Sequence, residues 1–147
     1  MTQTIKASVK SLEKSLQAEV LASNHKVLID EPVASGGDDE GMNPIELLLG
    51  GLGACQVLAA KMFAPSVNFQ FDEITIDVEG DFNPENMMSD DPNAYRGLTE
   101  IRCNYHIKTN ESDEKVKEFI DLIEDRCPVS DTLKAEVKVI KNGYTIN

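Results

Sequence analysis

The sequence is short of cysteine, histidine and positive charge, and each shortage argues against a class of protein. It has three cysteines, with no Cys-x-x-Cys pair, and two histidines. Those numbers argue against a disulfide scaffold and against a structural zinc site. The chain has 14 basic and 26 acidic residues, which gives a net charge of −12. This charge opposes binding to nucleic acid and to anionic membrane surfaces.

Long apolar runs are also missing. No run reaches the roughly 18 residues of a transmembrane helix, and the N-terminal stretch lacks the charged start and apolar core of a signal peptide. We therefore expect a cytoplasmic protein without a membrane partner. A chain of 147 residues is expected to form one domain, residues 1–147, which buries roughly two thirds of its unfolded surface.

The stretch from Asn43 to Phe63 predicts a central helix. Asn43 is a good N-cap, Pro44 suits the first helical position, and Glu46 can bond back to the cap amide. No charge occurs from Leu47 to Ala60, so the helix is expected to be covered on several sides. Three glycines lower its helix propensity: Gly50, Gly51 and Gly53. Their presence predicts close approach of another backbone, with Cys55 presented there.

The remaining segments predict an α+β fold with antiparallel pairing. Alternating or apolar runs predict strands over 4–10, 17–22, 25–30, 69–81, 97–109 and 134–141. Apolar residues at spacings of three, four and seven predict a helix over 112–126, and Pro128 can open another. Residues 32–41 and 83–95 are polar and acidic, and are predicted to be loops with solvated acids.

The three cysteines leave different alternatives open. Cys55 is either a reactive thiol or a small core residue, and it lies too far along its helix for the terminal dipole to stabilise a thiolate. Cys127 has the better local case for reactivity, because the helix opened by Pro128 places backbone amides near its sulfur. A helix-terminus cysteine without a role is an equal alternative. Cys103 alternates in phase with Ile101 and Tyr105, which favours a place in the sheet core.

Two separated signatures, Asn43-Pro-Ile-Glu-Leu-Leu-Leu-Gly-Gly-Leu-Gly-Ala-Cys55 and Cys127-Pro-Val-Ser130, resemble the OsmC/Ohr family of osmotically inducible and organic hydroperoxide resistance proteins. The resemblance implies an intertwined homodimer, with antiparallel sheets wrapped around central helices. It also implies a cysteine-based hydroperoxide reductase, an antioxidant oxidoreductase without metal or bound organic cofactor. Cys55 would be the peroxidatic residue and Cys127 the resolving one, with a disulfide that a dithiol such as dihydrolipoamide reduces.

The chain departs from that family at two supporting positions. The first arginine is Arg96, so the N-terminal strands lack the arginine that holds the thiolate in the family. Lys26 and His25 lie in that region but lack the planar fork of arginine. The family also has a glutamate ten residues before the helix cysteine, and in this chain that position is Ile45. Glu46 lies one residue later, which turns its side chain by about 100° around the helix axis. The pattern is similar to the broader OsmC-like branch. The alternative is a non-peroxidase dimer that binds a small hydrophobic or sulfur-containing ligand.

Overall fold

The computed structural model describes residues 1–14 and 16–147. The chain divides into two compact units, residues 1–50 and 51–147. The division falls within helix α1 (Pro44–Phe63). The strands are antiparallel in both units, and helices accompany them. The predicted α+β class with antiparallel pairing is therefore confirmed.

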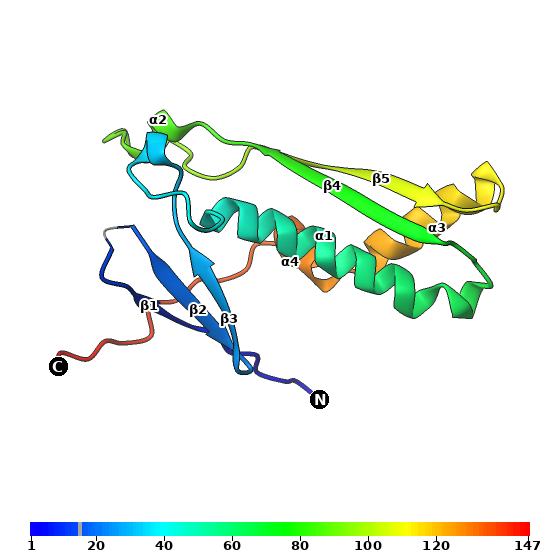
Figure 1. The fold of residues 1–147 in the computed structure, drawn as a ribbon, viewed down its shortest axis with the longest axis horizontal. Helices are drawn as coiled ribbons and strands as arrows, with labels where there is room; N and C mark the ends of the chain where they lie inside the picture. Colours follow the sequence, from blue (N-terminus) through cyan, green and yellow to red (C-terminus); the bar gives the residue numbers. More distant parts are fainter. Residues whose placement is uncertain (15) are drawn as a thin grey trace. The chain divides into compact units, whose positions relative to one another are not determined.

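The first unit holds a three-stranded sheet with the order β1-β2-β3 (Figure 1). The strands are β1 (Ser8–Ser11), β2 (Ala18–Ala22) and β3 (His25–Ile29). Strands β2 and β3 are joined by Ser23 and Asn24, whose φ angles are +49° and +65°. Two residues of positive φ are typical of a tight hairpin turn, because its twist matches that of the flanking strands. The tight connection predicted from the sequence is confirmed.

A buried carboxylate organises the loop that follows β3. Asp30 is 1% exposed. One of its oxygens accepts the amide of Glu31 at 2.7 Å, and the other accepts the side-chain amide of Gln17 at 3.0 Å. The amides of Asp38 and Glu40 also donate to it, at 3.4 and 3.2 Å. The Gln17 hydrogen bond and the backbone amides lower the pKa of Asp30 to about 2. This carboxylate therefore fixes the predicted loop, which contains a short 3₁₀ turn (Val33–Ser35).

Helix α1 begins as its sequence predicts. The Asn43 amide donates to Glu46 Oε2 and the Glu46 amide donates to Asn43 Oδ1, both at 2.8 Å. This reciprocal pair is a capping box. Of the helices in the described residues, α1 is long and apolar enough to cross a membrane, a property that core helices of soluble proteins share. Glu46 and Lys61 lie near its two ends.

The second unit is built around a long antiparallel pair, β4 (Glu73–Asp81) and β5 (Glu100–Lys108). Ile74, Ile76 and Val78 share the more buried face of β4, as the alternation predicted. Ile74 and Ile107 pack against the core, which comes from α1, the segment after it and helix α3 (Asp113–Asp125). Core members from these elements are Ala59, Ala60, Ala64, Phe69, Phe119 and Ile123.

Close packing explains one of the three helical glycines. A Cβ at Gly53 would lie 3.1 Å from Val78 Cγ2 and 3.6 Å from the Ile76 carbonyl oxygen. The predicted close approach of a backbone is therefore confirmed at Gly53, where α1 meets β4. At Gly50 and Gly51 a Cβ would meet no described atom within 4 Å. These two glycines are not explained by packing within the described chain.

The C-terminal region differs from the sequence prediction. Ser112 caps α3 through the Lys115 amide at 3.3 Å, and Pro128 opens helix α4 (Pro128–Lys134), both as expected. The strand predicted over 134–141 is wrong in this chain, since Lys134 ends α4 and residues 135–147 form no regular element. Alternation makes a strand only where another strand supplies the hydrogen bonds. The loop over 83–95 also contains one helical turn, α2 (Pro84–Met87).

Candidate functional site

Cys127 lies at the junction of two helices in the second unit. It comes two residues after the end of α3 and is the N-cap of α4. In this position its sulfur accepts a hydrogen bond from the Ser130 backbone amide at 3.3 Å. The backbone N–H of Cys127 donates to the Glu124 carbonyl at 3.3 Å. Pro128 at the first helical position fixes this geometry, because its ring sets φ and it has no N–H to satisfy. The predicted placement of backbone amides beside the sulfur is confirmed.

Those amides do not make Cys127 the more acidic thiol. The residue is 1% exposed, and burial disfavours the charged thiolate. Burial first, and then the neighbouring Cys55 thiol, raise the pKa of Cys127, although the Ser130 and Val129 amides act to lower it. The local case for Cys127 as the activated thiol is therefore wrong. Desolvation outweighs the helix start, and this thiol is protonated at neutral pH.

Cys55 lies beside Cys127, although 72 residues separate them along the chain. The Cys55 side chain interacts with the Cys127 sulfur and, after burial, is the next cause that raises the pKa of Cys127. Cys55 is half-buried on α1, and both residues are free thiols. The structure thus brings together an accessible thiol and a buried one. Both belong to the second unit, Cys55 on α1 and Cys127 at the start of α4.

The other residues predicted to support the site, Glu46, Lys26 and His25, belong to the first unit. Glu46 serves the capping box, and Lys26 Nζ lies 3.6 Å from Glu19. His25 begins β3, where it pairs with Ala22. Within the first unit, these three residues therefore have structural partners of their own.

The three arginines are engaged with other groups of the second unit. Arg96 donates to the carbonyls of Ser89 and Ala94. Arg102 binds three carboxylates, those of Glu79, Asp81 and Glu100, at 2.6 to 2.9 Å. Arg126 precedes Cys127, but its guanidinium lies 5.6 Å from the centre of the Phe63 ring and 3.6 Å from Asp125. Within the described residues, no arginine contact includes Cys55.

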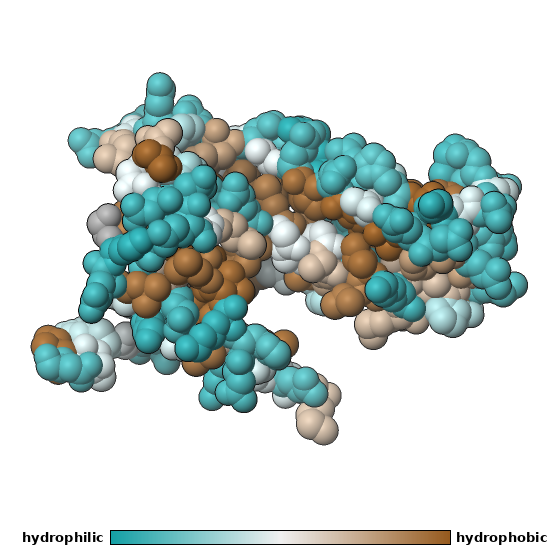
Figure 2. Space-filling view, viewed as in Figure 1, coloured by the Kyte–Doolittle hydropathy of each residue, from teal (hydrophilic) through white to brown (hydrophobic). Residues whose placement is uncertain are grey.

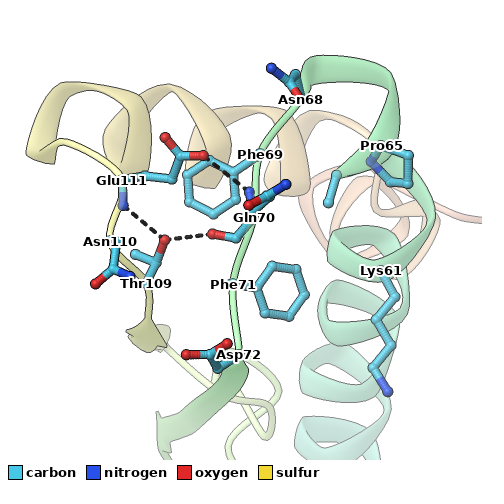
Figure 3. A pocket seen from close by; sticks show the side chains of 11 residues that line it. Lys61, Pro65, Asn68, Phe69, Gln70, Phe71, Asp72, Thr109, Asn110 and Glu111 are labelled. Atoms are coloured by element: carbon cyan, nitrogen blue, oxygen red, sulfur yellow. Dashed lines mark hydrogen bonds between the residues drawn. The ribbon is translucent and has the colours of Figure 1, made fainter.

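A pocket of about 800 Å³ lies at the far end of the same unit, between the end of α1 and the ends of β4 and β5 (Figure 3). Some of its polar groups are paired with one another: the backbone amide of Gln70 donates to Glu111 at 3.2 Å and the backbone amide of Glu111 donates to Thr109 Oγ1 at 3.1 Å. No cysteine is among the residues that line it. The pocket is therefore separate from the thiol pair.

A smaller cavity of about 330 Å³ contains one residue, Gln56, that the sequence patterns did not single out. Gln56 and Cys103 line it, together with Glu124 near the end of α3. Cys103 is half-buried on the inner face of β5, as its alternation predicted, and burial raises its pKa. Gln56 is 2% exposed. The sequence did offer a signal for this residue, because Gln56 is a polar side chain within the otherwise apolar, uncharged run of α1.

Comparison with known proteins gives one family. The sequence model of the family described as "OsmC-like protein" matches residues 37–141. A hydroperoxide reductase of Mycoplasma pneumoniae is 32% identical over 95 residues, which are 65% of this chain and 64% of that protein. The matched part thus spans less than two thirds of this relative's length.

Solved structures agree with the sequence comparison. The crystal structure of an OsmC-like protein from Mycoplasma pneumoniae superimposes with a TM-score of 0.79 at 26% identity, covering 91% of this chain and 89% of that one. An organic hydroperoxide resistance protein from Legionella pneumophila gives a TM-score of 0.69 at 18% identity, covering 91% of each chain. At 18% identity, the similarity to the Legionella pneumophila protein is evidence for the fold alone.

Proposed function

Because this chain belongs to the OsmC-like protein family, we propose that it is a thiol-dependent peroxidase that reduces organic hydroperoxides. Relatives named hydroperoxide reductase and organic hydroperoxide resistance protein support a peroxidase-like role in the family. The observation that carries the proposal for this chain is the half-buried Cys55 thiol beside the buried Cys127 thiol.

The proposed reaction uses these two sulfurs in a fixed order. The Cys55 thiolate attacks the outer oxygen of the hydroperoxide, the O–O bond breaks, and the alkoxide takes a proton and leaves as the alcohol. Cys55 is then a sulfenic acid. The Cys127 sulfur attacks it, water leaves, and a disulfide forms. An external dithiol such as dihydrolipoamide restores both thiols by exchange, so the cycle needs neither a metal nor a bound organic cofactor.

The exposure of the two cysteines supports this order. A hydroperoxide must reach the first thiol from solvent, and Cys55 is the more accessible of the pair. Cys127 is 1% exposed and its pKa is raised. A buried, protonated thiol is a poor primary nucleophile but is protected until a neighbouring sulfenic acid forms. These properties fit the resolving role.

Exposed apolar surface supports assembly as a homodimer, with sheets wrapped around central helices. Gly51, Ala54, Leu58 and Met62 form an exposed stripe at helical spacing on α1, with Leu58 58% and Met62 72% exposed. Figure 2 shows apolar surface left open among hydrophilic side chains. The C-terminal residues keep strand-like alternation and expose Val137, Val139, Ile140, Tyr144 and Ile146. A second copy would cover the stripe and pair this segment, as in the intertwined family dimer.

The test is to count free thiols before and after one equivalent of cumene hydroperoxide. The wild type should lose two thiols per chain, and Cys103→Ser should behave in the same way. Cys55→Ser should lose none, and Cys127→Ser should lose only one, with Cys55 trapped as a sulfenic acid. Continued peroxide consumption by Cys55→Ser, or loss of no thiol in the wild type, would overturn the proposal.

A second candidate is a non-peroxidase OsmC-like dimer that binds a small hydrophobic or sulfur-containing ligand. It is favoured by the absence of arginine before Arg96, since arginine has the planar fork that Lys26 and His25 lack. Steady turnover of cumene hydroperoxide with dihydrolipoamide would exclude this candidate. Saturable ligand binding without any thiol loss would favour it over the peroxidase.

A further inference from the structure

The cavity of about 330 Å³ lies in the second unit and is distinct from the thiol pair. Apolar side chains form part of its wall, among them Leu52 of α1, Leu98 of the segment before β5 and Leu133 of α4. Gln56, Cys103 and Glu124 supply polar groups. Neither Cys55 nor Cys127 is among its lining residues. The volume is at the lower end of the range of about 300 to 1,000 Å³ that small-molecule sites occupy.

Gln56 is the feature that points to a ligand. The residue is 2% exposed, and its side-chain oxygen is buried without a hydrogen-bond partner among the described residues. A buried acceptor that has lost water and gained no donor is costly, and such groups are rare in folded proteins. A bound molecule with an N–H or O–H group at this end of the cavity would satisfy that oxygen.

The charge at the same end specifies the donor further. Glu124 is half-buried, and its Oε1 accepts the Tyr105 hydroxyl at 3.0 Å. Burial first, and then this bond, raise the pKa of Tyr105, so its hydroxyl remains a donor at neutral pH. The second carboxylate oxygen has no hydrogen-bond partner in the described part of the chain. Glu124 and the Gln56 side chain both interact with Tyr105, so this oxygen offers a negatively charged acceptor in the same cavity as Gln56.

Two other charged residues line the cavity, but they are more exposed. Glu100 binds Arg102 at 2.6 Å, and Lys134 is exposed at the end of α4. Solvent screens exposed charges more strongly than buried ones. The half-buried carboxylate of Glu124 is thus the charge that a ligand inside the cavity experiences most. The net charge of −12 also favours the approach of a cation.

We propose that this cavity binds a small aliphatic primary ammonium compound. The ammonium group donates to Gln56 Oε1 and to the free oxygen of Glu124, and the aliphatic body packs against Leu52, Leu98 and Leu133. This is a second site, independent of the peroxidase chemistry. Loss of peroxide reduction would leave it unaffected, and loss of amine binding would leave the thiol reaction unaffected.

The test uses three probes with the same carbon skeleton: 3-methylbutylamine, 3-methylbutan-1-ol and 3-methylbutanoate. Each is titrated into the intact protein at neutral pH, and binding is followed by calorimetry and by the NMR signals of the Gln56 side-chain amide. The amine should bind saturably and shift those signals. The alcohol should bind about tenfold more weakly because it lacks the charge-assisted bond, and the carboxylate should not bind.

Variants distinguish the proposed site from general attraction to an acidic protein. Glu124→Gln should weaken amine binding about tenfold and bring it close to that of the alcohol. Glu118→Gln, an equal charge change on an exposed part of α3, should leave amine binding unchanged. Leu98→Phe fills the cavity and should abolish binding of both the amine and the alcohol while the circular dichroism spectrum is retained.

Three results would overturn the proposal. They are amine titration without saturation, equal affinity for the amine and the carboxylate, and equal weakening by Glu124→Gln and Glu118→Gln. If Glu124→Gln does not fold, the wild-type comparison of the three probes decides alone, because it requires no substitution.

Discussion

Phe119 is the residue whose truncation should cost the second unit most. It is 2% exposed, and its ring stacks on Phe69 with centroids 4.0 Å apart and planes 9° from parallel. Phe71 is tilted against it at 6.1 Å. Replacing a buried phenylalanine by alanine removes the apolar contacts and leaves a cavity, at a cost of about 3 to 5 kcal/mol. Because both neighbours of the ring are themselves large and anchored, we expect Phe119→Ala to lie at the upper end.

The assay is urea unfolding at one fixed protein concentration, since the stability of the proposed dimer would depend on concentration. With an m value of about 2 kcal/mol/M, a loss of about 5 kcal/mol should lower the urea midpoint by about 2.5 M. Phe82→Ala is the matched control, because Phe82 is 37% exposed and should cost less than about 1 kcal/mol. Equal losses for the two variants, or a loss below 1 kcal/mol for Phe119→Ala, would refute this account of the core.

Three further predictions concern single groups. The lowered pKa of Asp30 contributes stability that is present above its ordinary value of 3.8 and is lost as pH falls toward about 2. The thermal midpoint of the wild type should therefore fall more steeply in this window than that of Asp30→Asn. Ser112→Ala removes the cap on the Lys115 amide and should lower the free energy of unfolding by about 1 kcal/mol, measured in urea. Iodoacetamide should alkylate Cys127 at least about tenfold more slowly than Cys55, because Cys127 is 1% exposed and protonated. Peptide mass spectrometry measures both rates, and equal rates would contradict the assigned burial.

Local patterns in the sequence were sufficient where neighbouring residues satisfy one another. The capping box of Asn43 and Glu46 and the inward face of β4 formed as predicted. The turn of α2 was missed, although Asn83-Pro84 repeats the Asn43-Pro44 pattern and Asn83 caps it through the Glu85 amide at 3.1 Å. The same cap rule, applied to the acidic loop, would have found it.

Properties that depend on distant residues were not available from local patterns. The helix start beside Cys127 favoured a lowered pKa, but burial and Cys55 raise it. Burial is set by the packing of α3 and α1, which the flanking sequence does not specify. Asp30 is a similar case, because three of its four donors, Gln17, Asp38 and Glu40, come from segments 8 to 13 residues away.

The arginines show why one copy of the chain does not complete the proposed site. A thiolate is favoured by a nearby cation, yet Arg102 is held by three carboxylates and Arg126 lies against the Phe63 ring. Releasing Arg102 would break several charge-assisted hydrogen bonds at once. Of the remaining cations in the described residues, the lysines carry no such multiple restraint, and the exposed stripe on α1 leaves one side of the Cys55 helix open. An active peroxidase would therefore take its cation from a lysine of this chain or from the partner subunit, and activity that is lost on dissociation of the dimer would select the partner subunit.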